Sequence, residues 1–228
     1  MKNHLKTLAK LKEVKAIFFD LDGTLIDSEP IFQKFWCLAS KLNGYELTLE
    51  EELKLRSLDN SLAAKYLFGV SNGALDYQKV HDDRVRLMNE YLLEHPHKLK
   101  DGAIELLEYL VDRDIPLYIV TSNKKENALK TLETIGLSRF FKDVISTKNV
   151  AIGKPFPDVY IKALETLNLK AEEVITFEDS PNGLKSSSAA GIYTVMMEDM
   201  SPYDDEVSFV DDYYHDFKEI NDFLKQNI

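Results

Sequence analysis

The residues best suited to chemistry begin with two carboxylates, Asp20 and Asp22, in the segment 16–24 (AIFFDLDGT). The apolar run 16–19 predicts a short buried strand, and the Asp-Gly pair after it predicts a turn. Because side chains alternate along a strand, we expect both carboxylates on the same side of the chain, where they repel each other. A divalent cation would relieve the repulsion, and the pair could then divide nucleophilic attack and proton transfer. Taken alone, Asp-x-Asp-Gly favours a charged turn that has no chemical role.

Three further polar motifs follow apolar segments later in the chain. Each has an ordinary structural explanation when taken singly: a helix cap, a solvated lysine, or an acidic surface patch. If the strands form one parallel sheet, however, the motifs meet at a single crevice at the carboxyl ends of those strands. The motifs are Thr121-Ser122-Asn123 after segment 115–120, Lys154 within Gly153–Pro157 (GKPFP), and Glu178-Asp179 after segment 174–177.

Together these residue types suit phosphoryl transfer, which needs an in-line nucleophile and much charge neutralisation. Asp20 can attack phosphorus and form an aspartyl phosphate, while Asp22 protonates the leaving oxygen and later activates water. Mg²⁺ prefers oxygen ligands. We expect it to bind carboxylates of Asp20 and Asp179 and a carbonyl from the turn after Asp20, with Glu178 as a ligand or directly behind the ligands. Lys154, Thr121, Ser122 at a helix N-terminus and Asn123 are expected to hold phosphate oxygens.

The elements that must position these residues divide into two patterns. From residue 101 onward, helices and strands alternate, which predicts a doubly wound parallel α/β sheet of the Rossmann type. Between the first strand and residue 115 some 70 residues are helical, far more than a crossover between parallel strands requires. We therefore predict an α/β core domain of residues 1–28 and 98–228 and an inserted α-helical cap domain of residues 29–97.

The individual elements are predicted from apolar periodicity and turn residues. A short helix is expected within 1–13. In the inserted segment, helices are expected at 31–42, 48–55, 60–68 and 73–94. In the core, we expect a helix from Ala103 capped by Asp101, strands at 115–120, 144–145, 174–177, 193–196 and 207–210, helices at 157–168 and 181–190, and a closing helix with Phe217 and Leu224 inward.

Composition limits the classes of partner. The chain has 228 residues, 44% hydrophobic and 29% charged, and a net charge of −11, which disfavours nucleic acid or an anionic membrane as the main partner. Its one cysteine, Cys37, excludes an internal disulfide and is typical of a reducing compartment. No apolar segment is long enough for a signal peptide or a membrane span, so a cytoplasmic location is expected.

The four motifs in this order resemble the haloacid dehalogenase-like superfamily, in the branch with a helical cap inserted after the first strand. That branch includes the phosphoglycolate phosphatase-like enzymes and β-phosphoglucomutase. Asp20-Leu21-Asp22-Gly23-Thr24 matches the first motif, Thr121 the second, Lys154 the third and Glu178-Asp179 the fourth. The resemblance spans nearly the whole chain after residue 14.

The resemblance implies Mg²⁺ as cofactor, with the carbonyl of Asp22 as a ligand. It also implies a small phosphorylated metabolite as substrate, a monomer, and a cap that contacts the substrate. The segment 56–60 (RSLDN) lies where the family places its specificity loop, and Arg56 is there a candidate for binding an anionic group of the substrate. A solvated loop arginine would look the same in the sequence.

The motifs leave three alternatives to a phosphatase. A dehalogenase is disfavoured because a halide needs no proton, and Asp22 is present. A phosphosugar mutase of the β-phosphoglucomutase type remains open, although Phe32 stands where the family's mutases have a hinge histidine and Gly-Thr replaces their Gly-Val. A catalytically silent binding module would usually lack the nucleophile, the lysine or the metal-binding acid, and none of these is missing here.

Overall fold

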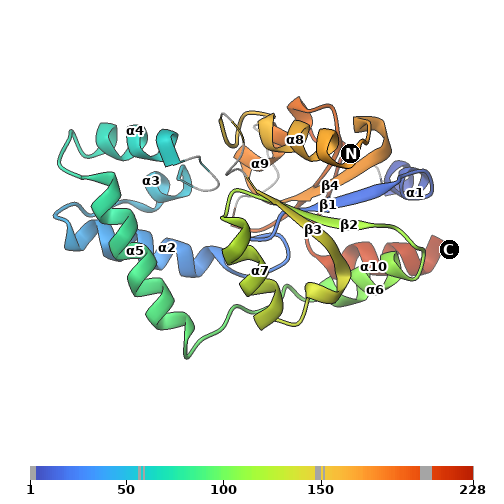
Figure 1. The fold of residues 1–228 in the computed structure, drawn as a ribbon, viewed down its shortest axis with the longest axis horizontal. Coiled ribbons are helices and arrows are strands. Elements are labelled where there is room, and N and C mark those ends of the chain that lie inside the picture. The colour runs from blue at the N-terminus through green and yellow to red at the C-terminus, as the bar shows by residue number, and fades with distance from the viewer. Residues whose placement is uncertain are drawn as a thin grey trace.

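The computed structural model of this protein describes residues 4–55, 58, 60–146, 150, 152–200 and 207–227. Figure 1 shows these residues as a sheet covered by helices, with a group of helices at one end. The elements are α1 (His4–Leu11), β1 (Ala16–Phe19), α2 (Glu29–Leu42), α3 (Leu49–Leu53), α4 (Asn60–Val70), α5 (Tyr77–Leu92), α6 (Ala103–Val111), β2 (Leu117–Thr121), α7 (Lys125–Thr134), η1 (Ser138–Phe140), β3 (Phe141–Ser146), α8 (Asp158–Leu167), η3 (Ala171–Glu173), β4 (Val174–Glu178), α9 (Pro181–Ala189), β5 (Tyr193–Met197), β6 (Asp212–Tyr214) and α10 (Phe217–Asn227).

Within these residues the sheet contains six strands in the order β3-β2-β1-β4-β5-β6, and each neighbouring pair is parallel. β1 lies between β2 and β4, with Phe19 opposite both Ile119 and Phe177. The strand order reverses at this point, so the carboxyl ends of β1, β2 and β4 lie side by side, where doubly wound proteins bind their ligands. The predicted fold class, a doubly wound parallel α/β sheet, is confirmed.

Alternating side chains of β1 divide the core into two layers. Ile17 and Phe19 pack with apolar residues of α1, α6, α7 and α10. Ala16 and Phe18 point to the other face and pack with residues of α8. All four side chains are at most 1% exposed, and burying a side chain as large as Ile or Phe contributes about 1.5–3 kcal/mol. This strand therefore has little freedom to shift, which fixes the residue that follows it.

Two local predictions were wrong. Segment 207–210 forms a turn, although Val207 is buried against Leu184 and Met196, and the last strand is β6. β6 begins at a buried aspartate, Asp212, which accepts a 2.7 Å hydrogen bond from the Thr7 hydroxyl. A strand that begins with an aspartate lacks the apolar pattern from which strands are predicted, so the sequence did not indicate β6.

The second wrong prediction is the cap of α6, which is Gly102 rather than Asp101. Gly102 has a φ of +83°, and a Cβ on it would lie 2.9 Å from the backbone nitrogen of Lys218 in α10. Close approach of another backbone requires glycine here. The helix therefore begins without a hydrogen bond from a capping side chain.

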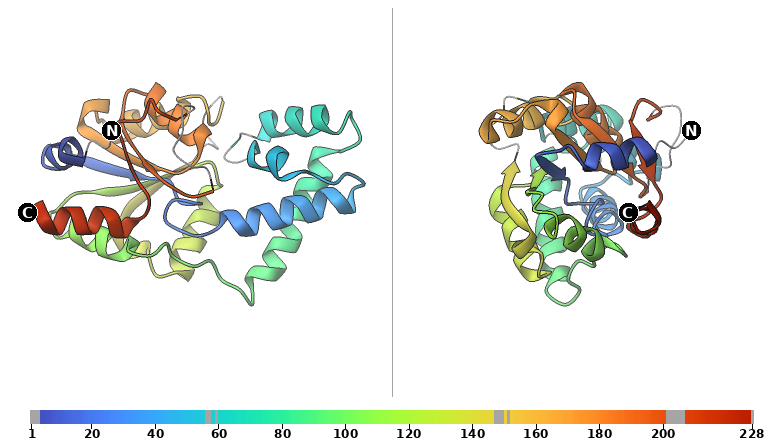
Figure 2. Two further views of the ribbon diagram at one scale, coloured as in Figure 1. Left: turned by 180° about the vertical axis from the view of Figure 1, so that it is seen from behind. Right: turned by 90° about the vertical axis from the view of Figure 1, so that its right-hand side faces the viewer.

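Helices α2 to α5 form a group with its own hydrophobic cluster, at the end of the sheet where β1 and β4 terminate (Figures 1 and 2). The predicted helices at 31–42, 48–55, 60–68 and 73–94 correspond to these four elements. Cys37 is half-buried against this cluster, and burial raises the pKa of its thiol. The cluster comprises Ala39, Leu47, Leu55, Ala63, Leu67, Leu75 and Val80.

Two antiparallel segments join the helical group to the sheet. Ile26 and Leu99 form a bridge, the nitrogen of Asp27 donates to the oxygen of Lys98, and the nitrogen of Lys100 donates to the oxygen of Leu25, both at 2.9 Å. The domain boundaries at residues 28–29 and 97–98 stay a prediction.

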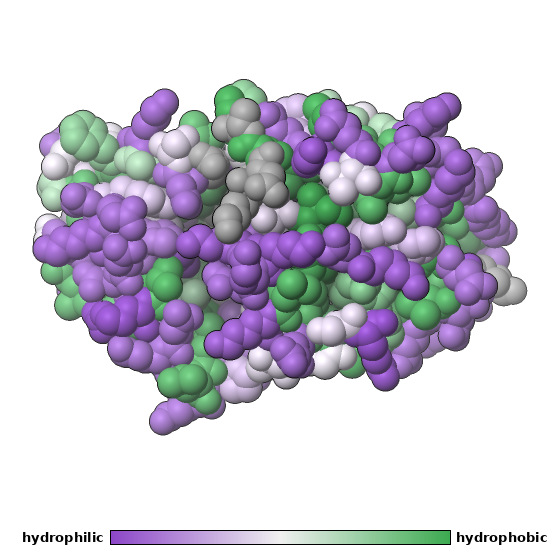
Figure 3. Space-filling model, in the orientation of Figure 1, coloured by the Kyte–Doolittle hydropathy of each residue, from purple (hydrophilic) through white to green (hydrophobic). Residues whose placement is uncertain are grey.

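The face of the molecule in Figure 3 is mostly hydrophilic, with smaller hydrophobic areas between. None of the helices within the described ranges combines the length and the apolar character needed to cross a lipid bilayer.

Candidate active site

Asp20 is the first residue after β1 and is 3% exposed. Its backbone nitrogen donates to the oxygen of Phe177 at 3.0 Å, which continues the pairing of β1 with β4. Its carboxylate oxygen Oδ1 accepts a 2.6 Å hydrogen bond from Lys154 Nζ. Burial raises the pKa of Asp20 well above its usual value; Lys154 opposes this change, and the charges of Glu178 and Asp179 add to it.

Lys154 is completely buried and also donates to Glu178 Oε1. The same glutamate oxygen accepts a 2.5 Å hydrogen bond from the Tyr160 hydroxyl of α8. Burial alone would lower the pKa of Lys154, but the charges of Asp20 and Glu178 outweigh burial and raise it. Lys154 therefore remains a cation inside the protein and holds two carboxylates from different strands.

Asp179, directly after β4, is completely buried. Its Oδ1 accepts a 2.8 Å hydrogen bond from the Thr24 hydroxyl. The turn before Thr24 comes so close that a Cβ on Gly23 would lie 2.4 Å from Asp179 Oδ2, and Gly23 has a φ of +82°. Glycine is required at this position for both reasons.

Three buried carboxylates converge at this end of the sheet. Asp20, Glu178 and Asp179 each offer an oxygen, and these oxygens lie within 4.8 Å of one another. Lys154 supplies one positive charge against three negative charges, and Glu178 Oε2 is buried without a hydrogen-bond partner among the described residues. Buried carboxylates with an unmet charge and an all-oxygen donor set suit a hard divalent cation. The residues present therefore fit a metal site.

Asp22 lies apart from this group of three. Its carboxylate is half-buried and receives hydrogen bonds from Ser28 and Asn123. Burial raises the pKa of Asp22, while the His97 ring, Ser28 and Asn123 oppose that change. Ligation of a metal through the backbone carbonyl of Asp22 stays a prediction.

Of the residues expected at the end of β2, Thr121 lies where it was predicted and Ser122 does not. Thr121, the last residue of the strand, is 1% exposed, and its hydroxyl oxygen accepts from the nitrogen of Asn123 at 3.0 Å. That bond leaves the hydroxyl proton able to donate to a ligand. Ser122 is half-buried in the loop, and α7 begins only at Lys125, so Ser122 does not stand at the helix N-terminus as expected. Arg56 lies outside the described residues.

Three contributors to the site were missed from the sequence. Tyr160 lies on the apolar face of α8, where its pattern is that of a core aromatic. Thr24 was noted only as part of the first motif, and its contact with Asp179 spans 155 residues. His97 belongs to none of the four motifs. It directly precedes Lys98, in the second of the two hinge segments that join the helical group to the sheet, where it is half-buried and interacts electrostatically with Asp22.

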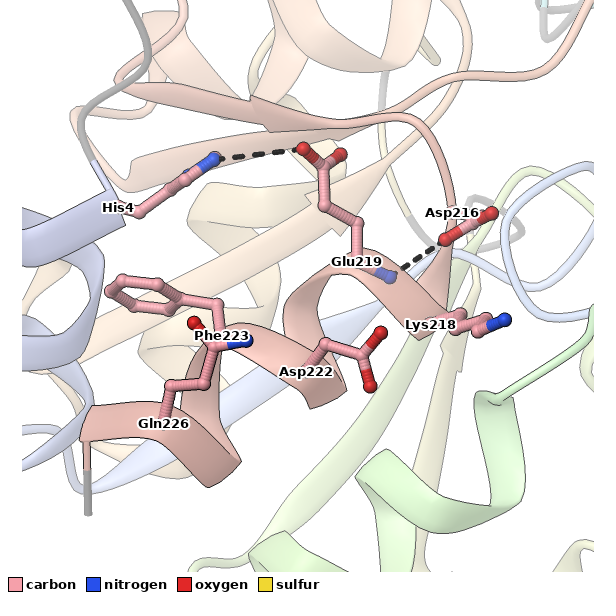
Figure 4. A pocket seen from close by; sticks show the side chains of 7 residues that line it. All are labelled: His4, Asp216, Lys218, Glu219, Asp222, Phe223 and Gln226. Carbon is pink, nitrogen blue, oxygen red and sulfur yellow. Dashed lines mark hydrogen bonds and ion pairs between the residues drawn. The ribbon is translucent and has the colours of Figure 1, made fainter.

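A shallow depression of about 470 Å³ lies elsewhere, between the start of α1 and one side of α10 (Figure 4). Two interactions link residues around it: His4 Nε2 lies 3.8 Å from Glu219 Oε1, and the backbone nitrogen of Glu219 donates to Asp216 Oδ1 at 2.7 Å. None of its lining residues comes from the four motifs. The convergence at β1, β2 and β4 remains the candidate active site.

Two relatives and one solved structure are among the proteins similar to this chain. A "Phosphorylated carbohydrates phosphatase" of Thermotoga maritima is 29% identical over 183 residues, which cover 78% of this chain and 82% of that protein. A "Validoxylamine A 7'-phosphate phosphatase" of Streptomyces hygroscopicus is 32% identical over 184 residues, 79% of this chain and 84% of that protein. The crystal structure of a β-phosphoglucomutase from Clostridium difficile shares the fold, with a TM-score of 0.80, 16% identity, and coverage of 94% and 96% of the two chains.

The profile of the family described as "Haloacid dehalogenase-like hydrolase" matches residues 17–197, which include all four motifs. The chain belongs to the haloacid dehalogenase-like hydrolase family.

Proposed function

We propose that this hydrolase is a Mg²⁺-dependent phosphatase that cleaves a small phosphomonoester through an aspartyl phosphate on Asp20. The observation that carries the proposal is the buried contact of Asp20 with Lys154 beside Glu178 and Asp179. The phosphatase names of the relatives from Thermotoga maritima and Streptomyces hygroscopicus support it.

In this proposal Asp20 attacks phosphorus in line with the leaving oxygen. Lys154 keeps the nucleophile oriented through its 2.6 Å hydrogen bond and offsets the negative charge that the phosphate brings. The Thr121 hydroxyl, Ser122 and Asn123 hold the remaining phosphate oxygens.

Asp22 performs the proton transfers. Because its pKa is raised by burial, its carboxyl group keeps a proton at higher pH than an exposed aspartate does, and it can donate that proton to the leaving alcohol. The resulting carboxylate then takes a proton from the water that hydrolyses the aspartyl phosphate. Ser28 and Asn123 fix its orientation.

Asp20, Asp179 and the carbonyl of Asp22 would hold Mg²⁺, with Glu178 as a further ligand or directly behind them. When bound, the ion shields the attacking carboxylate from the phosphate oxygens. The preference for Mg²⁺ follows from the all-oxygen donor set, without Cys or His among the three clustered residues.

The substrate in this proposal is a small phosphorylated metabolite, because we expect the inserted helices α2 to α5 to close over the site and exclude a polymer. A cytoplasmic location, a monomeric state and the absence of nucleic-acid or membrane partners stay predictions from composition and family.

The test combines Asp20→Asn with metal removal, using p-nitrophenyl phosphate and a panel of sugar phosphates. Turnover should fall by at least 1000-fold in Asp20→Asn, while the exposed control Asp112→Asn keeps wild-type rates. EDTA should abolish wild-type activity and added Mg²⁺ restore it. Asp179→Asn should raise the Mg²⁺ concentration for half-maximal rate by tenfold or more. Full activity in metal-free buffer, or in Asp20→Asn, would contradict the proposal.

A mutase remains the second candidate because of His97. Phe32 occupies the hinge position at which a mutase histidine was expected, but the His97 ring of the other hinge segment lies 6.3 Å from the Phe32 ring and interacts with Asp22. The absence of histidine at position 32 is thus weaker evidence against a mutase than the sequence indicated. Incubation with β-glucose 1-phosphate, Mg²⁺ and a trace of glucose 1,6-bisphosphate distinguishes a mutase from a phosphatase. Rapid formation of glucose 6-phosphate with little free phosphate would favour the mutase.

A further inference from the structure

Arg84, in the middle of α5, is held by two aromatic side chains of α2. Its guanidinium carbon lies 4.6 Å from the centre of the Trp36 ring and 5.6 Å from the centre of the Phe32 ring. Cation–π contacts of this kind orient an arginine without neutralising its charge. The side chain is thereby fixed between two helices of the inserted group.

This arginine has no acidic partner in the part of the chain that the structure describes. Its Nε is buried and without a hydrogen-bond partner there, and no carboxylate lies within ion-pair distance. Arg86, two residues further along the same helix, differs in every respect. It is 54% exposed and pairs with Asp83 at 3.0 Å and Glu90 at 3.5 Å. The Arg84 side chain as a whole is half-buried, but a buried Nε without a hydrogen-bond partner is costly, so its position calls for a ligand.

Arg84 lies on the Asp22 side of the active site. It packs over Phe32, whose backbone nitrogen donates to the oxygen of Ser28 at 2.9 Å. The Ser28 side chain in turn forms a hydrogen bond with the Asp22 carboxylate. In the proposed mechanism Asp22 protonates the leaving oxygen, so the alcohol part of the ester begins beside Asp22. That part lies opposite Asp20 because the displacement is in line. Arg84 therefore stands on the side of the alcohol part, away from the phosphate that Lys154 binds.

We propose that Arg84 binds a second oxyanion on the alcohol part of the substrate, either a carboxylate or a second phosphate. The inference rests on the proposed phosphatase function and narrows its substrate class. The planar guanidinium matches both groups with paired hydrogen bonds, and Trp36 and Phe32 hold it in place before the substrate arrives. Arg84 is a specificity-determining residue and takes no part in the bond changes at phosphorus.

The experiment compares esters that differ only in the second group. One series is ethyl phosphate, 2-phosphoglycolate and ethanediol bisphosphate; the other is sorbitol 6-phosphate, gluconate 6-phosphate and sorbitol 1,6-bisphosphate. We measure kcat and KM for the wild type, Arg84→Met, Arg84→Lys and the matched control Arg86→Met. Methionine keeps an apolar stem against Trp36 and Phe32, and circular dichroism checks the fold.

In at least one series, the wild type should favour an ester with a second oxyanion over the neutral ester by about 10- to 100-fold in kcat/KM, the range for hydrogen bonds to charged groups. Arg84→Met should remove most of that preference, mainly through KM, and Arg84→Lys should keep part of it. Arg86→Met should change it by less than about twofold. The carboxylate and bisphosphate members show which oxyanion is bound.

Three results would overturn the inference. The wild type could prefer the neutral ester in both series. Arg84→Met could lower kcat/KM equally for all esters of a series. Arg86→Met could have the same effect on the preference as Arg84→Met. Failure of the proposed function itself looks different, because the wild type would then hydrolyse no ester, including p-nitrophenyl phosphate, in the presence of Mg²⁺.

Discussion

Replacing Lys154 with methionine should destabilise the protein strongly, because it removes the cation that contacts two buried carboxylates. Lys154 and Glu178 are completely buried, and the Asp20 side chain is 4% exposed, so water cannot replace the lost charge. Breaking a buried ion pair by removing one partner costs about 3–5 kcal/mol. This is a large share of a typical free energy of unfolding of about 5–15 kcal/mol.

The loss should depend on pH, because the variant can avoid a buried charge by protonating Asp20. Protonation costs about 1.4 kcal/mol for each pH unit above the ordinary pKa. From the reference pKa of 3.8, the cost is about 1.6 kcal/mol at pH 5 and about 5.7 kcal/mol at pH 8. At pH 8 the full 3–5 kcal/mol should therefore appear, and at pH 5 about 2 kcal/mol or less.

The pH dependence of the stability loss comes from the Asp20 carboxylate and not from Lys154. The pKa of Lys154 is raised above its usual 10.5 in the folded protein, so the stability that this lysine contributes is complete at both pH values and is lost only above pH 10.5. The pKa of Asp20 is raised as well. The folded state therefore binds more protons than the unfolded state above pH 3.8, and rising pH lowers stability through this group.

Urea unfolding followed by circular dichroism, at pH 5 and pH 8 with EDTA present, measures the effect. Lys125→Met is the matched control, because Lys125 pairs with Asp143 at the surface, with side chains 42% and 47% exposed. Exposed pairs contribute about 0–1 kcal/mol. A loss below 1 kcal/mol for Lys154→Met at pH 8, or an equal loss at both pH values, would refute the reasoning.

Two further predictions concern the Glu178 carboxylate and the Tyr193 hydroxyl in β5. Gly183→Ala should displace Glu178 and raise the Mg²⁺ requirement of the activity, because the new Cβ would lie 2.0 Å from Glu178 Oε2. The control Gly69→Ala places its Cβ where no atom lies within 4 Å, and it should stabilise the protein by about 0.5–1 kcal/mol. Equal behaviour of the two variants in Mg²⁺ titration and urea unfolding would contradict the displacement of Glu178. Burial raises the pKa of Tyr193 to about 12 from 10.0. As pH rises from 10 to 12, this tyrosine therefore ionises first in the unfolded chain, and the free energy of unfolding should fall. Tyr193→Phe should flatten that part of the stability profile, and an unchanged slope would count against this role of Tyr193.

The sequence was sufficient for the fold class and for the expectation that Asp20, Lys154 and Glu178 lie at the same end of the sheet. Parallel strands with polar residues at their carboxyl ends constrain where such residues meet, so order along the chain already implies proximity. Thr121 lies at the end of β2 for the same reason, one residue inside the strand rather than after it.

What the sequence could not indicate depends on contacts between distant elements. Arg84 looks like any charged residue of an amphipathic helix until α2 places Trp36 and Phe32 against it. Tyr160 has the pattern of a core residue, and only the position of Glu178 gives its hydroxyl a partner. β6 was missed because a buried aspartate inside a strand needs Thr7 from the other end of the chain. In each case the deciding interaction is tertiary, and local pattern has no access to it.

The central place of β1 in the sheet has a consequence for how the chain is made. Ribosomes synthesise this strand early, yet both of its neighbours, β2 and β4, come after the whole helical insertion. Asp20 meets Lys154 across 134 residues, and Thr24 meets Asp179 across 155. A nascent or truncated chain that ends before Val174 lacks the β4 partner of β1 and exposes an apolar edge open to aggregation. The acids of the site come together only in a nearly finished polypeptide, so catalysis begins only after most of the core has been synthesised.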